Sequence, residues 1–252
     1  MLPEVIISII VFLYGIVVGS FLNVCIYRIP KKENIVKVRS HCMQCNYQLK
    51  WYDLIPVFSY LFLRGKCRKC GTKISSQYPI IESLNGLIWV VIYLVKGANV
   101  ESLLSCLLAS ALIALSVIDF RTYEIPVGFN IFIACLGIAN LVLNYRNWLN
   151  FVIGALCVSL FLYLLYIFSK GRAIGGGDIK LMAACGLLIG WKLIIFAFCL
   201  GCVAGAVIHI LRMKITKADH VLAMGPYLSF GVLIAALWGD AIIRWYLNVC
   251  GL

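Results

Sequence analysis

The chain has 252 residues, of which 63% are hydrophobic and only 13% are charged, and its formal net charge is +12. This apolar content excludes an ordinary soluble domain, since several runs approach the roughly 18 apolar residues that span a bilayer. Leu, Ile and Val are mixed without strict two-residue alternation, which excludes an outer-membrane barrel. We therefore expect an all-α polytopic membrane protein with about seven or eight transmembrane helices and one small soluble insertion.

Candidate spans follow one another along the chain at residues 4–26, 79–96, 102–119, 127–144, 150–168, 180–190, 193–211 and 225–249. The first run lacks the basic start of a cleavable signal, so we interpret it as a retained membrane helix. The short run 180–190 is either a half-helix or a span packed against its neighbour. We expect three regions, namely a first membrane helix at 1–26, a loop at 27–78 and a membrane-embedded region at 79–252.

The basic residues are distributed unevenly. Of 22 Lys and Arg, 11 lie between Arg28 and Lys73. If residues 27–78 are cytoplasmic, alternate loops place 18 basic residues on that side and 4 on the other, which the positive-inside rule favours. Cationic loops beside membrane helices set topology and contact anionic lipid, so we expect lipid rather than nucleic acid as a partner.

Four cysteines within the loop form two C-x2-C pairs separated by 21 residues: Cys42, Cys45, Cys67 and Cys70. Four thiolates at this spacing suit tetrahedral zinc, and Asn46 and Gly71 after the pairs fit tight turns. Such a site is structural, because four sulfurs leave no open position for chemistry. It would stabilise a polar loop that is too small for a robust core. A redox or disulfide role is the alternative, although the cytoplasm disfavours disulfides.

An ionisable residue at or inside a membrane span is costly and by default functional, and Glu82, Asp119 and Asp178 are the candidates for such a role. Glu82, near the start of the second span, either meets a site at the cytoplasmic face or neutralises the basic loop. Asp119 ends the third span, and Asp178 follows three glycines, Gly175, Gly176 and Gly177. The predicted topology places both aspartates at the cytoplasmic membrane face.

Asp119 and Asp178 have the chemistry of a hydrolytic pair. Two carboxyls that share a proton supply a base for water and an acid for the departing amine. The glycines let the backbone approach an extended substrate closely. The alternative is structural, with Asp178 capping the next helix and Asp119 capping a helix or pairing with Arg121.

In chain order the motifs resemble those of the prepilin peptidases, the A24 aspartic peptidases. They are Gly19-Ser20-Phe21-Leu22-Asn23-Val24, Tyr27-Arg28-Ile29-Pro30, the paired C-x2-C, Arg64-Gly65-Lys66-Cys67, Asp119-Phe120-Arg121, Ile125-Pro126, and Gly-x-Gly-Asp ending at Asp178 before Ile179-Lys180-Leu181. The ordered set covers about residues 15–185.

The resemblance implies that Asp119 and Asp178 are the catalytic pair. It implies an enzyme of the bacterial cytoplasmic membrane that cuts the short basic leader from type IV prepilins or pseudopilins at the cytoplasmic face. It also links the N-terminal region and its cysteines to methylation of the new N-terminus by S-adenosylmethionine. No glycine-rich strand-turn-helix for such a methyl donor is present in the sequence.

Three other functions remain open at this point. A proton- or cation-coupled transporter would use the two aspartates for ions and the cysteines as a regulatory zinc knuckle, but its carboxylates should lie nearer the bilayer midplane. A membrane thiol oxidoreductase would use the C-x2-C pairs on the oxidising side of the membrane. A structural assembly platform would tolerate loss of both aspartates.

Overall fold

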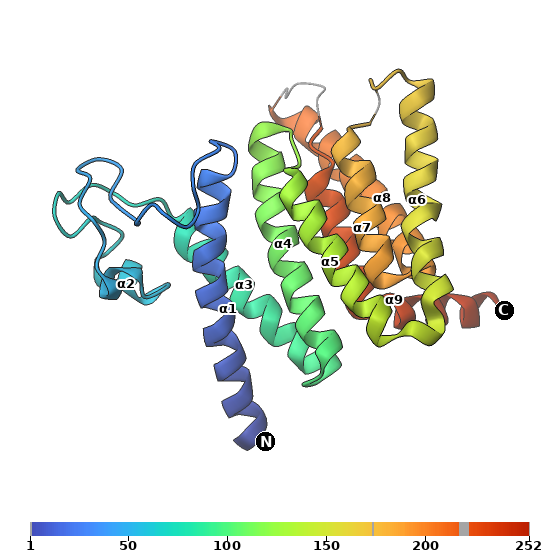
Figure 1. Ribbon diagram of the computed structural model, residues 1–252, viewed down its shortest axis with the longest axis horizontal. Coiled ribbons are helices and arrows are strands. Elements are labelled where there is room, and N and C mark those ends of the chain that lie inside the picture. The colour runs from blue at the N-terminus through green and yellow to red at the C-terminus, as the bar shows by residue number, and fades with distance from the viewer. Residues whose placement is uncertain (1, 173, 217–221, 252) are drawn as a thin grey trace. The chain divides into compact units, whose positions relative to one another are not determined.

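The computed structural model describes residues 2–172, 174–216 and 222–251. These residues are helical with no strand, apart from two isolated antiparallel bridges (Figure 1). In chain order the helices are α1 (Leu2–Arg28), the 3-10 turn η1 (Trp51–Leu54), α2 (Phe58–Phe62), α3 (Gln77–Lys96), α4 (Val100–Thr122), α5 (Val127–Leu143), the 3-10 turn η2 (Tyr145–Asn147), α6 (Trp148–Phe168), α7 (Gly176–Ile189), α8 (Trp191–Thr216) and α9 (Gly225–Cys250). The all-α prediction is confirmed.

Within the described residues, six helices are long and apolar enough to cross a membrane: α1, α3, α4, α6, α8 and α9. The apolar helices α5 and α7 are shorter, with 17 and 14 residues. Each of the eight predicted spans overlaps one of these eight helices, and their ends agree to within three residues except at two places. The α8 helix continues past the predicted residue 211 to Thr216, and α7 begins before the predicted residue 180, at Gly176, so it includes Asp178 in its first turn. The chain is therefore a polytopic helical membrane protein.

The chain divides into two compact units, residues 1–114 and 115–252, with the boundary inside α4. We call them the N-terminal unit and the C-terminal unit. The N-terminal unit contains α1, the insertion at 29–76, α3 and the first part of α4. The C-terminal unit contains the end of α4 and the helices α5 to α9.

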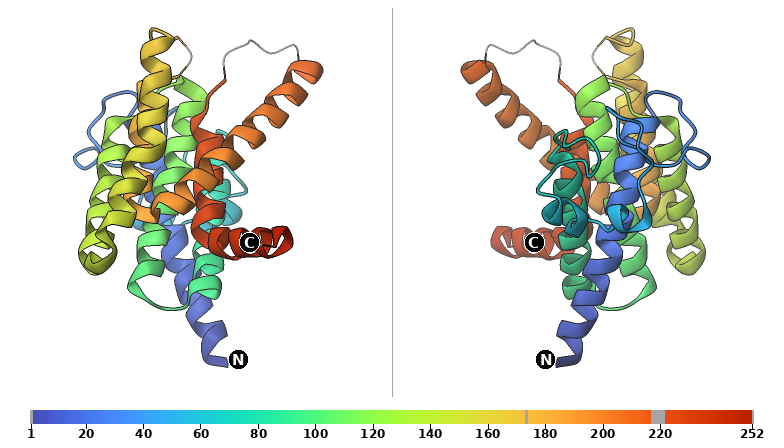
Figure 2. Two further views of the ribbon diagram at one scale, coloured as in Figure 1. Left: turned by 90° about the vertical axis from the view of Figure 1, so that its right-hand side faces the viewer. Right: turned by 90° about the vertical axis from the view of Figure 1, so that its left-hand side faces the viewer.

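Small residues bring α1 and α3 together in the N-terminal unit (Figures 1 and 2). A Cβ placed on Gly15 would lie 2.7 Å from the Cα of Gly86, and one on Gly19 would lie 2.8 Å from the Cα of Glu82. Asn85 Nδ2 donates a hydrogen bond to the Gly15 carbonyl across this contact, at 2.7 Å. Close backbone approach of this kind is how small residues join helices in lipid.

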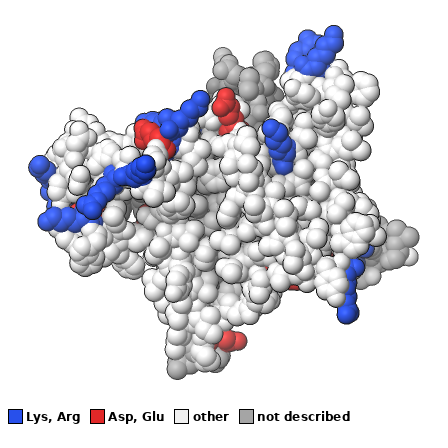
Figure 3. All heavy atoms as spheres, in the orientation of Figure 1, with Lys and Arg blue, Asp and Glu red and all other residues white. Residues whose placement is uncertain are grey.

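The insertion between α1 and α3 is mostly irregular, with only η1 and α2 as regular elements. Its first residues fold back on the end of α1, where Arg28 Nη1 donates to the carbonyls of Ile35 and Val38 at 3.0 and 2.9 Å. Figure 3 shows Lys and Arg side chains gathered on the surface of this insertion. A segment so polar needs anchors other than an apolar core.

In the C-terminal unit, α7 contacts α5, α6 and α8, and α8 packs on α9 (Figures 1 and 2). A Cβ on Gly201 would lie 3.0 Å from the Tyr227 carbonyl oxygen, so this glycine lets α8 approach α9 closely. The helices α5 and α7 run parallel. The side chain of Ile125 meets Gly177 near their starts, and Gly137 meets Leu187 near their ends. The beginnings of α5 and α7 therefore lie at the same end of the unit.

Candidate functional site

The four cysteines of the insertion converge on one point. Their sulfur atoms all lie within 4.8 Å of one another. The Sγ–Sγ distance is 3.8 Å between Cys42 and Cys70 and 4.0 Å between Cys45 and Cys67. Four sulfurs about 2.3 Å from a zinc ion at tetrahedral angles would be separated by nearly the same distance, about 3.8 Å. The donor set and its geometry both fit zinc.

The two cysteine pairs have the same local structure. Each lies in a loop closed by an antiparallel bridge, His41 with Gln48 and Lys66 with Lys73. In each loop the amide of the first cysteine donates a hydrogen bond to a carbonyl five residues further along. The Cys42 amide donates to the Tyr47 carbonyl, and the Cys67 amide donates to the Thr72 carbonyl.

The residue after each pair takes a left-handed conformation. Asn46 has φ of 53° and Gly71 has φ of 71°. Their amides donate to the carbonyls of Cys42 and Cys67, both at 2.9 Å. Asn and Gly are the residues that adopt this conformation most readily. The prediction that they form the tight turns of the knuckles is confirmed.

The electrostatics of the sulfurs suit a bound cation. Hydrogen bonding with the hydroxyl and then the amide of Thr72 lowers the pKa of Cys70 to about 6, and the Cys45 amide lowers the pKa of Cys42. The Tyr47 amide lowers the pKa of Cys45, but desolvation and the neighbouring sulfurs raise it to about 11. Crowded sulfurs cannot all ionise alone, and a divalent metal removes that conflict by neutralising the thiolates.

An ion pair joins the second knuckle to the segment between the knuckles. Arg68 Nε donates to Asp53 Oδ1 at 2.8 Å, and the Asp53 side chain is 2% exposed. The Lys50 amide donates to Asp53 Oδ2, and the Arg68 guanidinium lies 4.9 Å from the centre of the Tyr52 ring. Because Arg68 stands between two of the cysteines, this pair helps to hold the cysteine cluster in place.

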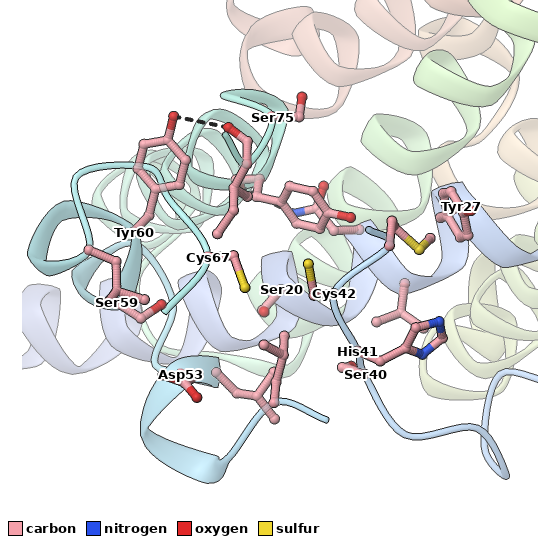
Figure 4. Close-up of a pocket in the computed structure, with 18 of the residues that line it drawn as sticks. Ser20, Tyr27, Ser40, His41, Cys42, Asp53, Ser59, Tyr60, Cys67 and Ser75 are labelled. Carbon is pink, nitrogen blue, oxygen red and sulfur yellow. Dashed lines mark hydrogen bonds between the residues drawn. The ribbon is translucent and has the colours of Figure 1, made fainter. Parts of the chain in front are cut away.

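A cavity of about 730 Å³ lies within the N-terminal unit, between α1, the insertion and the start of α3. Figure 4 shows Cys42 and Cys67 at its wall, with Tyr27 and Tyr60 among the other lining residues. Tyr78 and Glu82 line it from α3. Its walls combine aromatic rings with both acidic and basic side chains, among them Glu82, Asp53 and Arg68.

Glu82 links the insertion to the helices. It is 5% exposed, and its Oε2 accepts a hydrogen bond from the Val57 amide at 2.7 Å. The Ser20 hydroxyl on α1 also hydrogen-bonds to it. Val57 has φ of 62°, which is strained for a β-branched residue. A contact of Glu82 with this amide was not foreseen from the sequence, because nothing local in the chain signals a bond between residues 25 positions apart.

In the C-terminal unit, Asp119 lies near the end of α4 and is 4% exposed. Its Oδ2 accepts a hydrogen bond from the Gly225 amide at 2.8 Å, at the N-terminus of α9. A Cβ on Gly225 would lie 2.6 Å from that oxygen, so only glycine fits there. Gly225 was not among the site residues predicted from the sequence. Its signal was Gly225-Pro226, a pair typical of a helix start, where free amides attract anions.

Asp178 lies in the first turn of α7, outside the six membrane-length helices. Its Oδ1 is buried without a hydrogen-bond partner among the described residues. Burial, together with the negative charge of Asp119, raises the pKa of Asp178 to about 6. The two aspartates are thus close enough to interact electrostatically, although they are far apart in the chain.

The three glycines before Asp178 have different surroundings. Gly175 precedes α7 in an extended conformation, and its carbonyl accepts a hydrogen bond from the Asp178 amide at 3.2 Å. A Cβ on Gly177 would lie 2.9 Å from the Ile125 Cβ, so Gly177 allows close packing with the start of α5. A Cβ on Gly176 would meet nothing within 4 Å. Beside Asp178, the backbone is therefore tightly packed at Gly177 and has open space next to it at Gly176.

Comparisons with known proteins agree with this division of the chain. The model of the bacterial peptidase A24 N-terminal domain matches residues 13–96, which include the cysteines and Glu82. The model of the type IV leader peptidase family matches residues 106–210, which include both aspartates.

Several curated proteins are similar over most of their length. A protein of Aeromonas salmonicida (strain A449) named prepilin leader peptidase/N-methyltransferase is 32% identical over 270 residues, covering 94% of this chain and 93% of that protein. Its namesake from Bacillus subtilis (strain 168) is 32% identical over 244 residues, covering 95% and 98%. The one from Legionella pneumophila is 30% identical over 269 residues, covering 95% and 94%. No solved structure is significantly similar.

Proposed function

Since the chain belongs to the type IV leader peptidase family, we propose that it removes the short basic leader of type IV prepilins or pseudopilins, with Asp119 and Asp178 as the catalytic pair. The observation that carries this proposal is that Asp119 and Asp178, two carboxylates of the C-terminal unit, lie near enough for the charge of Asp119 to raise the pKa of Asp178. Two such groups that share one proton are suited to peptide hydrolysis without a covalent intermediate.

The surroundings of each aspartate support different roles. The Gly225 amide stabilises the ionised form of Asp119 by a charge-assisted hydrogen bond. Asp178 keeps its proton more readily than an ordinary aspartate, because its pKa is raised to about 6. In the proposed reaction Asp119 takes a proton from water, and the water oxygen bonds to the scissile carbonyl carbon. Asp178 gives its proton to the amine nitrogen as the carbon–nitrogen bond breaks.

The distribution of basic residues supports cleavage at the cytoplasmic face of a bacterial cytoplasmic membrane. With residues 27–78 in the cytoplasm, 18 of 22 Lys and Arg lie on that side, and the ends of α4 and α7 that carry the aspartates face it too. A prepilin combines a basic leader with an apolar helix. That helix would lie in the bilayer beside the enzyme, with the junction at the catalytic pair.

A second activity, methylation of the new N-terminus by S-adenosylmethionine, is supported by the cavity of the N-terminal unit. The relatives carry N-methyltransferase in their names. The cavity has room for a ligand of this size, and the tyrosine rings and Glu82 provide partners for a sulfonium cation and an amine. In this proposal Cys42, Cys45, Cys67 and Cys70 hold a structural zinc ion that shapes one wall.

The test is incubation of the purified protein in detergent with a candidate prepilin, with and without S-adenosylmethionine, followed by intact mass measurement. We expect loss of the leader mass, and a further gain of one methyl group when the donor is present. Asp119→Asn and Asp178→Asn should each lower cleavage by about 10³-fold or more, since each removes one of the two proton-transfer groups. Asp240→Asn, an exposed acid of α9, is the control.

Substantial cleavage by either aspartate variant would refute the catalytic pair. Absence of any mass change with several different prepilins would favour the proton- or cation-coupled transporter. Cleavage without the added mass of a methyl group, when S-adenosylmethionine is present, would limit the function to peptidase activity.

A further inference from the structure

The middle of the insertion, residues 51–62, presents large apolar side chains on its surface, and we call it the apolar segment. Trp51 is 77% exposed, Leu61 is 63% exposed and Phe62 is 85% exposed. The other exposed apolar side chains of the segment are Leu54, Ile55 and Phe58. Asp53 is the only charged residue of the segment, and its side chain is buried against Arg68. Exposed apolar surface of this extent marks a site of interaction.

Basic residues flank the apolar segment on both sides. Lys50 immediately precedes it, Arg64 follows it after one leucine, and both side chains are exposed. Apolar side chains bordered by Lys and Arg are the pattern of a segment that lies in the membrane interface, with its apolar face among the acyl chains and its cations at the phosphate headgroups. The charge pattern therefore favours a lipid surface as the partner.

The hydrogen bonds of Glu82 fix the depth of this segment beside the membrane helices of the N-terminal unit. The Val57 amide donates to Glu82 Oε2 at 2.7 Å, and the Ser20 hydroxyl hydrogen-bonds to the same carboxylate. Helix α3 has 20 residues, and a length of about 30 Å equals the thickness of the hydrocarbon core, so its start lies at the edge of that core. Glu82 lies about 8 Å inside this start, and Ser20 lies about 12 Å inside the end of α1.

The apolar segment is therefore level with the membrane helices and not beyond their ends. Figure 1 shows α2, which begins directly after Val57, level with the middle part of α1. Irregular backbone at membrane depth requires its polar groups to be paired. The Val57 amide is paired with Glu82, and the Phe58 amide donates to the Pro56 carbonyl at 2.6 Å. The turn between η1 and α2 thus meets this requirement.

We propose that the apolar segment dips into the bilayer leaflet at the end of α1 and the start of α3, where lipid acyl chains cover its exposed face. Trp51, Leu61 and Phe62 contact the acyl chains, and Lys50 and Arg64 lie at the headgroups. This inference rests on the membrane class of the chain and is independent of the proposed function.

The same segment forms part of the wall of the cavity. The lining residues that it contributes are Asp53, Leu54, Pro56, Ser59 and Tyr60. The segment would thus separate the cavity from the lipid and place that wall at membrane depth.

The experiment uses the full chain in nanodiscs of phosphatidylethanolamine and phosphatidylglycerol, with the photoreactive p-benzoylphenylalanine in place of Phe62. Irradiation followed by intact mass measurement should show the added mass of one phospholipid. The matched control is the same replacement at Val36, which is 90% exposed in the insertion but outside the apolar segment. Its lipid adduct should be at least about tenfold weaker, the change in equilibrium that burial of one phenylalanine side chain produces. Val17, exposed on α1, is the positive control.

A second measurement needs no photoreactive residue. Trypsin cleavage after Arg64 is followed in the same nanodiscs for wild type, Phe62→Asn and Val36→Asn. Phe62→Asn removes an apolar side chain from the lipid, so cleavage should become about tenfold faster as the segment leaves the bilayer more often. Val36→Asn should leave the rate unchanged.

Equal lipid adducts at positions 62 and 36, or none at position 62 while position 17 reacts, would overturn the inference. A crosslink at position 62 with the mass of a second copy of the chain would also overturn it, because the face would then be covered by protein. If the photoreactive variant does not fold, as judged by gel filtration, the trypsin measurement decides, and an unchanged rate in Phe62→Asn excludes the proposed membrane contact.

Discussion

The two aspartates differ in what surrounds each carboxyl group. Asp119 accepts the Gly225 amide through Oδ2, whereas Oδ1 of Asp178 is buried without a partner among the described residues. The two identical side chains therefore differ in their hydrogen bonding, and differences in surroundings are how paired carboxylates divide the roles of acid and base. The sequence predicted the pair but not this asymmetry, because it depends on the start of a helix more than 100 residues away.

The raised pKa of Asp178 predicts a pH-dependent gain in stability for Asp178→Asn. The pKa is about 6 in the folded protein and about 4 for an ordinary aspartate. The protonated carboxyl therefore favours folding, a contribution that is complete below about pH 4 and is lost as the pH rises through about 6. The melting temperature of Asp178→Asn, relative to wild type, should increase by several degrees between these pH values and then level off.

Thermal unfolding in detergent across this pH range makes the measurement, with Asp240→Asn as the control for loss of an exposed carboxylate. A difference between Asp178→Asn and wild type that stays constant, or that shrinks as the pH rises, would contradict the raised pKa.

At the scale of elements, the insertion is held by specific bonds rather than by a core. The cysteine cluster closes its two knuckles, the Arg68–Asp53 pair links them, and Glu82 holds the Val57 amide. The cysteine spacing predicted the first of these. The other two depend on how the insertion folds against α1 and α3, which no local pattern records. Each bond should therefore have a separate and measurable effect.

Replacing one cysteine ligand should release the metal. Purified wild-type protein should contain about one zinc ion per chain, and Cys42→Ser should reduce this several-fold, because three thiolates bind a structural zinc much more weakly than four. Elemental analysis by mass spectrometry makes the measurement. Cys135→Ser, an exposed cysteine of α5 outside the cluster, is the control. Unchanged zinc in Cys42→Ser would show that the metal is bound elsewhere.

Loss of the Glu82 carboxylate should loosen the insertion. Glu82→Leu leaves the Val57 amide without its acceptor, so limited proteolysis within residues 29–76 should become about tenfold faster, as for the loss of one hydrogen bond to a charged group. Glu82→Gln keeps an acceptor oxygen and should change the rate much less. Glu33→Leu, an exposed acid of the insertion, is the control. Equal rates in Glu82→Leu and wild type would exclude this anchoring role.

At the scale of the whole molecule, the two proposed activities belong to different units. The aspartate pair lies entirely in the C-terminal unit, and the cavity and cysteines lie entirely in the N-terminal unit. Both depend on one orientation in the membrane, since leader cleavage and methylation act on the same end of the same substrate. The proposed orientation follows from the basic residues alone and is open to a direct test.

Labelling with a membrane-impermeant thiol reagent tests this orientation. Val36 is 90% exposed in the insertion, so Val36→Cys should gain label over the parent protein only after the cells are lysed. Cys250, exposed at the end of α9, should be labelled in intact spheroplasts, and Cys250→Ser should remove that label. Labelling of Val36→Cys before lysis would reverse the proposed topology.

The sequence by itself determined the membrane class, the approximate positions of eight helices and the four-cysteine cluster with its turns at Asn46 and Gly71, and it singled out the two aspartates. These features are local, because apolar run length, ligand spacing and turn chemistry act over a few residues or one helix. The tertiary structure decided that the Gly225 amide bonds Asp119 and that the Val57 amide bonds Glu82. Those contacts join segments distant in the chain, and helix packing through small residues brings them together.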